Sequence, residues 1–175
     1  MRLYLVRHAE TDSNKEGRAM GQREDPPLNE GGVQQVVQLL PDLPRDVEVL
    51  YSSSLKRASQ TAGYIAKELG LPIVFHPDIL ERDLGKISGM LWKDAEVIFG
   101  KPWKELRSDD IDPLYEVEEM DKLRERVRGF VEYVRINHKG NVMVVTHAGV
   151  IRRVYEILGK EMDNPGNASI QVLEI

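Results

Sequence analysis

Short apolar runs alternate along the chain with segments that have the apolar spacing of amphipathic helices, and this alternation limits the folds that the chain can adopt. The apolar runs are 3–6, 47–51, 73–75, 141–145 and 170–175, and the helical segments are 29–40, 55–69, 123–134 and 150–158. Strands that alternate with helices usually form βαβ units with parallel strands. The sequence therefore predicts a layered α/β domain with a largely parallel sheet.

Two of these segments show the contrast between the patterns. In segment 29–40, Val33, Val36 and Leu40 recur at helical spacing, so one face of a helix is apolar. Segment 141–145 is instead a continuous valine-rich run, which is typical of a strand buried on both faces. We expect this strand near the centre of the sheet.

The 175 residues of the chain fit one domain, because a domain usually has about 100–200 residues. Segment 86–117 is the least regular part, and it holds Trp92 and Trp103 together with two prolines and an acidic run. We predict a single domain, residues 1–175, in which residues 86–117 form an inserted lid.

Composition excludes several classes of protein. The formal net charge is −5, whereas proteins that coat nucleic acids or bind membrane surfaces usually have a basic excess. Cysteine is absent, which excludes disulfide scaffolds, thiolate metal sites and cysteine nucleophiles. No apolar run approaches the roughly 18–20 residues of a membrane span, and the N-terminus lacks the apolar core of a signal peptide. We therefore expect a cytoplasmic protein that binds neither nucleic acid nor membrane.

Polar side chains that can do chemistry follow four of the predicted strands. Arg7 and His8 end the first strand, and His147 follows the valine-rich strand. Arg57 opens the helix after the second strand, and Glu81 follows the third by a short loop. Ligands of open α/β sheets bind outside the carboxyl ends of the strands. We therefore expect these side chains to meet in one site.

Five short motifs stand along the chain, most of them at these strand ends. They are RHAET at 7–11 followed by Asn14, DPPLNEG at 25–31, SSSLKRASQTA at 52–62, LE at 80–81 and THAG at 146–149. In this order they resemble the motifs of the histidine phosphatase superfamily, and the first is similar to its Arg-His-Gly-Glu-Thr signature. The resemblance implies the phosphoglycerate-mutase-like fold, a three-layer α/β/α sandwich with a mostly parallel central sheet. It also implies a phosphatase that acts through a phosphohistidine.

The resemblance implies that His8 is the nucleophile, which attacks phosphorus through a neutral imidazole nitrogen. The positive charges of Arg7 and Arg57 are expected to lower the pKa of this histidine. A hydrogen bond from the other ring nitrogen to a backbone carbonyl would hold the reactive tautomer. Arg7 and Arg57 are also suited to forked hydrogen bonds with phosphoryl oxygens.

The same resemblance gives roles to three further residues. Glu81 is the expected general acid, which protonates the leaving oxygen and then takes a proton from water. His147 and Asn14 are expected to donate hydrogen bonds to the phosphoryl oxygens. Because the arginines and His147 supply positive charge, we expect no metal and no other cofactor.

Two alanines, Ala9 and Ala148, stand where glycine is common in the family. A Cβ atom strains the backbone only where φ is positive. We expect neither position to need a positive φ, so that alanine is tolerated at both.

Hydrolysis is favoured over transfer between phosphoglycerates. The mutases of this family place a tyrosine three residues and a lysine eleven residues after the acid, with an arginine pair further on. Here those two positions are Leu84 and Trp92, and segment 86–117 contains no adjacent arginines. A second phosphate or a carboxylate of the substrate is therefore expected to find few partners.

Three alternatives stay open. They are phosphoryl transfer of the phosphoglycerate mutase type, a metal-dependent enzyme that uses His8, His147 and Glu81 as ligands, and a protein that binds phosphate ligands without turnover. The expected partner is a small phosphate monoester, such as a sugar phosphate or α-ribazole phosphate. The apolar strand at 170–175 offers an edge for a second copy, so a homodimer also stays open.

Overall fold

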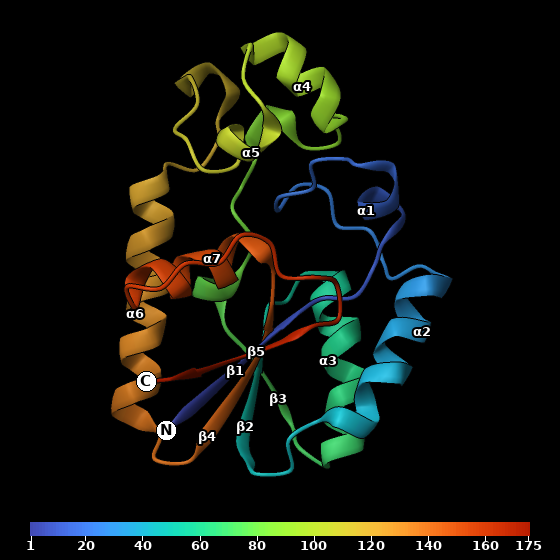
Figure 1. Cartoon of the computed structure of the whole chain (residues 1–175), viewed down its shortest axis with the longest axis vertical. Helices are drawn as coiled ribbons and strands as arrows, with labels where there is room; N and C mark the ends of the chain where they lie inside the picture. The colour runs from blue at the N-terminus through green and yellow to red at the C-terminus, as the bar shows by residue number, and fades with distance from the viewer.

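The computed structural model describes residues 1–175 and contains one five-stranded sheet (Figure 1). Its strands are β1 (Arg2–Arg7), β2 (Val47–Ser52), β3 (Ile73–Phe75), β4 (Asn141–Thr146) and β5 (Ile170–Glu174). Their spatial order is β3-β2-β4-β1-β5, and all neighbours are parallel except β1 and β5, which are antiparallel. The predicted largely parallel sheet is confirmed, with the valine-rich β4 at its centre.

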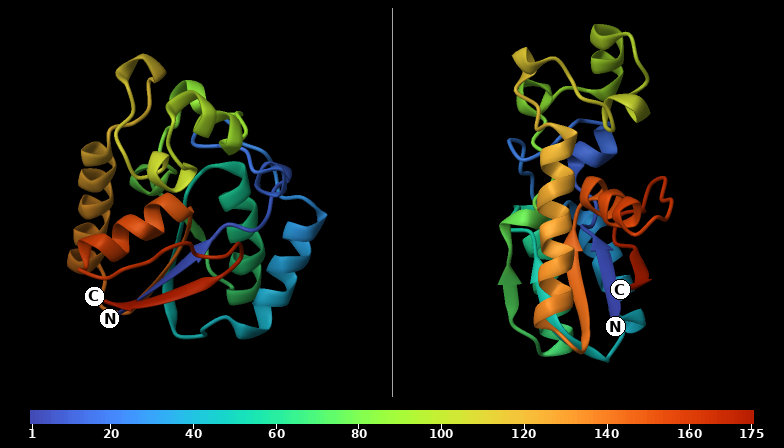
Figure 2. Two further views of the ribbon diagram at one scale, coloured as in Figure 1. Left: turned by 45° about the horizontal axis from the view of Figure 1, so that its top comes forward. Right: turned by 90° about the vertical axis from the view of Figure 1, so that its left-hand side faces the viewer.

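Helices cover both faces of the sheet, which gives three layers (Figures 1 and 2). α2 (Glu30–Leu39) and α3 (Lys56–Leu69) lie on one face. α6 (Met120–Asn137) and α7 (Ala148–Ile157) lie on the other. The predicted α/β/α sandwich is therefore confirmed, and each predicted helix is present within a few residues of its predicted bounds.

The apolar core explains why the strands are continuous apolar runs. Along β1, Leu3 and Leu5 belong to the cluster formed with α6 and α7, whereas Tyr4 and Val6 belong to the cluster formed with α3. Adjacent strand residues point to opposite faces, so a strand that is covered on both sides needs apolar residues at every position. Each buried side chain of this size contributes on the order of 1.5–3 kcal/mol to folding.

The predicted lid segment, residues 86–117, lies beyond the carboxyl ends of the strands (Figure 1). It contains α4 (Trp92–Phe99) and α5 (Trp103–Leu106). A separate small apolar cluster supports it, formed by Ala19, Leu84, Ile87, Ala95 and Leu106. That residues 1–175 form one domain with a lid stays a prediction.

Several short elements were not predicted from the sequence. They are α4, α5, α1 (Asp12–Glu16) and the 3-10 turns Leu40–Asp42, Pro77–Ile79, Gly85–Ile87 and Pro113–Tyr115. Elements this short do not complete an apolar repeat, so periodicity cannot reveal them. α1 depends instead on a capping box, in which the Thr11 side chain accepts from the Asn14 amide and Asn14 bonds back to Thr11.

Two features bear on the expected partners. β5 forms one edge of the sheet, and Val172 on it is 53% exposed. Pairing of two copies across this edge stays a prediction. None of the helices combines the length and the apolar character that crossing a bilayer requires.

The start of α2 packs so closely on the loop after β1 that Gly32 has no room for a side chain. A Cβ atom at Gly32 would collide with the carbonyl oxygen of Glu10. We expect Gly32→Ala to lower the free energy of unfolding by about 1–3 kcal/mol, because the loop or the helix must move. Gly129→Ala is the matched control, since Gly129 lies in α6 with open space around it. That variant should raise stability by about 0.5–1 kcal/mol. Urea unfolding measures both changes, and an unchanged Gly32→Ala would contradict the close packing.

Candidate active site

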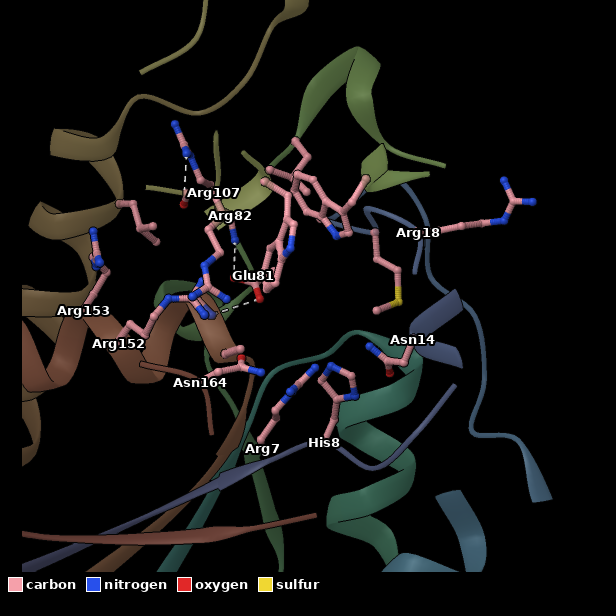
Figure 3. Close-up of a pocket in the computed structure, with 18 of the residues that line it drawn as sticks. Arg7, His8, Asn14, Arg18, Glu81, Arg82, Arg107, Arg152, Arg153 and Asn164 are labelled. Atoms are coloured by element: carbon pink, nitrogen blue, oxygen red, sulfur yellow. Dashed lines mark hydrogen bonds between the residues drawn. The ribbon is translucent and has the colours of Figure 1, made fainter. Parts of the chain in front are cut away.

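A cavity of about 410 Å³ opens between the carboxyl edge of the sheet and the lid segment (Figure 3). Five of the six predicted site residues line it: Arg7, His8, Asn14, Arg57 and Glu81. The sixth, His147, is fully buried and lies next to His8, with 5.2 Å between the ring centroids. The structure therefore brings all six together, although they are scattered along the sequence.

His8 follows β1 directly, and its backbone amide donates to the Thr146 carbonyl at the end of β4. Its Nδ1 atom lies 2.8 Å from the carbonyl oxygen of Ala9. A carbonyl only accepts, so Nδ1 carries the proton and Nε2 has the free lone pair. Burial lowers the pKa of His8 well below its ordinary value, and the charges of Arg57 and Arg7 lower it further. Burial is thus a larger cause of the lowered pKa than the two charges expected from the sequence.

Arg57, which is buried, and Arg7, which is half-buried, lie beside this imidazole and are held by backbone carbonyl groups. Arg57 donates to the carbonyls of Gly21 at 2.7 Å and Glu24 at 3.1 Å, and Arg7 donates to that of Pro165 at 2.7 Å. The Nε–H group of each arginine is buried without a hydrogen-bond partner. Buried donors are normally satisfied, so these two groups are suited to receive the oxygens of an anion.

Glu81 is held at the start of α7. Its two carboxylate oxygens accept from the backbone amides of Gly149 at 3.2 Å and Arg82 at 2.9 Å (Figure 3). A Cβ atom at Gly149 would collide with this carboxylate, so the helix can approach it only with glycine there. The N-terminus of a helix also stabilises a negative charge.

His147 precedes α7 and is oriented by Ser53. The Ser53 hydroxyl lies 2.8 Å from Nε2 of His147 and already accepts a hydrogen bond from the Leu55 amide. Nε2 of His147 is the one acceptor within reach of the Ser53 hydroxyl proton, and when it accepts that proton the ring proton of His147 is on Nδ1. Nδ1 is buried without a partner. Burial, followed by the charge of Arg57, lowers the pKa of His147 well below its ordinary value, so this ring is neutral and donates through Nδ1.

The two alanines do not strain the backbone. Positive φ values at residues other than glycine occur at Glu116 and Ala168, and not at Ala9 or Ala148. Alanine is therefore tolerated at both positions, as the sequence analysis expected.

The charged groups of the cavity do not match a metal site. No three or more histidine, aspartate or glutamate side chains lie close enough together to hold an ion. Seven arginines line the cavity instead: Arg7, Arg18, Arg57, Arg82, Arg107, Arg152 and Arg153. A wall of this charge attracts an anion and repels a cation.

Comparison with known proteins decides the family. The model of the histidine phosphatase superfamily (branch 1) matches residues 3–175. The chain belongs to this superfamily. Its membership confirms the family that the sequence motifs predicted.

Relatives of this histidine phosphatase include named phosphatases. It is 38% identical over 159 residues to the metal-independent phosphoserine phosphatase of Arabidopsis thaliana, covering 87% of this chain and 66% of that protein. It is 34% identical over 166 residues to phosphoserine phosphatase 1 of Hydrogenobacter thermophilus, covering 93% and 78%. A mycobacterial glucosyl-3-phosphoglycerate phosphatase, solved with VO3, superposes with a TM-score of 0.87 at 26% identity, covering 99% and 92%. The chain is a phosphatase, and hydrolysis of small phosphate monoesters is consistent with these relatives.

Three residues that position the site of this histidine phosphatase were missed in the sequence. Ser53 orients His147, as described above. Asn167, in the loop before β5, donates to the His8 carbonyl at 3.0 Å. Arg126 of α6 donates to the carbonyls of Leu80 at 2.7 Å and Glu81 at 3.0 Å. Serine, asparagine and arginine are common surface residues, so only the fold reveals these contacts.

The buried histidines make the stability of this histidine phosphatase depend on pH. Below about pH 6.5 an unfolded histidine gains a proton that His8 and His147, with their lowered pKa values, do not gain in the folded chain. The free energy of unfolding therefore falls as the pH falls, by up to about 1.4 kcal/mol per pH unit for each ring.

We expect His8→Gln to reduce this slope between about pH 6.5 and 5, because one of the two rings is gone. Urea unfolding at several pH values, compared with the wild type, measures the difference. Equal slopes would contradict a neutral His8 in the folded chain.

Proposed function

We propose that this histidine phosphatase hydrolyses small phosphate monoesters through a phosphohistidine on Nε2 of His8. One observation carries the proposal: the hydrogen bond from Nδ1 to Ala9 leaves a neutral, unprotonated Nε2 in a cavity lined by arginines. A histidine in this state is a nucleophile. Phosphorus becomes a good target when neighbouring donors withdraw charge from its oxygens.

Four groups would hold the phosphoryl oxygens. The buried Nε–H groups of Arg7 and Arg57 have no protein partner, and the same holds for Nδ1 of His147. The side-chain oxygen of Asn14 accepts from Thr11, so its amide is turned for donation from the cavity wall. These donors are fixed before the substrate arrives, which is the arrangement that stabilises charge developing on the oxygens.

The reaction would proceed in two steps that use His8 and Glu81. First, the lone pair of Nε2 forms a bond to phosphorus while the bond from phosphorus to the ester oxygen breaks, and Glu81 protonates the leaving oxygen. Then the Glu81 carboxylate removes a proton from water, whose oxygen bonds to phosphorus as the N–P bond breaks. The products are the alcohol and inorganic phosphate, and both residues return to their starting states.

The cavity and the relatives support a small substrate. A volume of about 410 Å³ lies at the lower end of the range for small-molecule sites. Trp92 and Trp103, with 6.2 Å between ring centroids, provide an apolar wall on the lid side. We propose that residues 86–117 act as the lid that covers this substrate.

The nucleophile is tested with p-nitrophenyl phosphate in the presence and absence of EDTA and vanadate. We expect turnover by the wild type that persists in EDTA and falls with vanadate, which imitates the five-coordinate phosphorus of the transition state. His8→Ala should lose at least about 1000-fold in kcat, because it lacks the attacking group. His138→Ala is the control, since His138 bonds to Tyr51 and does not line the cavity. Turnover that survives in His8→Ala, or its absence in the wild type, would overturn the proposed function.

The general acid is tested by changing the leaving group. We expect Glu81→Gln to lower kcat by about 10²–10⁴-fold for an alkyl phosphate, whose leaving oxygen needs a proton. The loss should be much smaller for p-nitrophenyl phosphate, whose leaving group is stable as an anion. Glu125→Gln, on the exposed face of α6, is the matched control. An equal loss for both substrates would contradict the acid role of Glu81.

A further inference from the structure

The cavity contains a second group of cations that the proposed mechanism does not use. Arg152 and Arg153 come from α7, and Arg107 comes from the lid segment just after α5 (Figure 3). All three line the same cavity as His8. On α7, Gly149, Arg152 and Arg153 are spaced i, i+3 and i+4, so the two arginines lie on the same helix face as Gly149, which contacts Glu81.

Arg152 is the least satisfied cation of this group. It extends from α7 toward Glu81 (Figure 3). Burial lowers its pKa to about 10, and among the charges that act on it, Glu81 favours the cation whereas Arg107, Arg153 and Arg7 oppose it. No hydrogen bond contributes to holding it. A guanidinium group in this position gains its missing partner when an anion enters the cavity.

The two neighbours of Arg152 are also incompletely paired. Arg107 donates to the Asp163 carboxylate at 3.1 Å and stacks on Trp103, but its Nε–H is buried without a partner. Nε of Arg153 lies 3.0 Å from the Glu156 carboxylate without the alignment of a hydrogen bond. Both residues therefore keep donors free for a ligand.

A structural arginine in the same wall looks different. Arg82 is 3% exposed and donates to the carbonyls of Glu118 at 2.8 Å and Asp109 at 2.9 Å, so it fastens the lid segment. Arg152 has no such bonds although it is just as close to the cavity. Arg152 therefore has its guanidinium donors available, whereas those of Arg82 are used by backbone carbonyls.

We propose that Arg152, with Arg107 and Arg153, forms a second anion subsite, which selects phosphate monoesters that carry a further carboxylate or phosphate group. The inference rests on the proposed function, because it assumes that the hydrolysed phosphoryl group lies at Arg7, His8 and Arg57. Guanidinium groups bind both kinds of anion through paired N–H donors.

The proposed subsite differs from one expectation drawn from the sequence. The absence of adjacent arginines from segment 86–117 led us to expect few partners for a second anion. The adjacent pair lies instead at Arg152 and Arg153, and the fold carries α7 to the cavity. The expectation considered only the lid as a source of cations, whereas the proposed subsite takes two of its three arginines from α7.

The test compares two substrates that differ only in the second charge. 3-Phosphoglycerate has a carboxylate where glycerol 3-phosphate has a hydroxymethyl group. We expect the wild type to prefer 3-phosphoglycerate in kcat/KM, and Arg152→Met to reduce this preference by about 10–100-fold, the effect of losing hydrogen bonds between charged groups. Arg152→Lys should reduce it less, because the charge remains but the fork is lost. A second pair, ribulose 1,5-bisphosphate and ribulose 5-phosphate, is compared in kcat/KM in the same way and tests whether the subsite accepts a second phosphate.

Arg128→Met is the matched control, since Arg128 lies on the exposed face of α6. It should leave both preferences unchanged. If the wild type prefers the doubly charged substrate in only one of the two pairs, the proposal is supported, and that pair identifies the anion that the subsite accepts. Equal kcat/KM values within both pairs, or preferences that Arg152→Met does not alter, would overturn it.

A second readout separates this proposal from the proposed function. Calorimetric titration of 3-phosphoglycerate and glycerol 3-phosphate into His8→Ala and into the double variant His8→Ala/Arg152→Met measures the same preference as binding, because the nucleophile is absent from both. If the wild type fails to hydrolyse p-nitrophenyl phosphate, the proposed function falls and the binding preference still decides the subsite. If it hydrolyses p-nitrophenyl phosphate but His8→Ala shows no binding preference, only the subsite falls.

Discussion

The parallel pairing of β1 with β4 is the constraint on which the site depends. In this register Arg7 lies opposite Thr146, so the next residue of each strand, His8 and His147, leaves the sheet at the same point. The two residues lie near opposite ends of the chain, and only this pairing brings their rings to 5.2 Å. The apolar layers on both faces hold the register, because a slip by one residue would turn every side chain of β1 to the wrong layer.

Buried nitrogen atoms that lack a hydrogen-bond partner are the main electrostatic feature of this arrangement. Five of the buried nitrogen atoms that lack a hydrogen-bond partner belong to Arg7, Arg57, Arg107, Arg153 and His147. Burial lowers the pKa of each of these groups, which means that holding the four arginine charges away from water costs the folded chain free energy, whereas His147 is neutral. A bound anion offsets this cost, so the site binds its ligand with donors that are already desolvated and aligned. The same arrangement that weakens the free fold therefore favours phosphoryl chemistry.

The position of Glu81 depends on contacts from several directions. Its carboxylate rests on the start of α7, and its carbonyl accepts from Gln22 and from Arg126 of α6. The next residue, Arg82, binds carbonyl groups at the end of the lid segment and beyond it. Hydrogen bonds thus connect Glu81 and Arg82 to α6, to the start of α7 and to segment 86–117.

Most of the helices and strands of this protein could be predicted from its sequence, because alternating strand and helix patterns are local signals. The polar residues at the strand ends predicted where a site would lie, and the resemblance of the motifs to the histidine phosphatase superfamily supplied the expected roles of His8, Arg7 and Arg57. Only the tertiary structure revealed which further polar residues face the cavity. In the sequence, Arg152 and Arg153 look like exposed arginines of an amphipathic helix, as Arg128 does, so the local pattern does not show that they line a cavity. What separates them is the packing of α7 against the carboxyl edge of the sheet, and contacts between residues distant in sequence are not encoded in a local pattern.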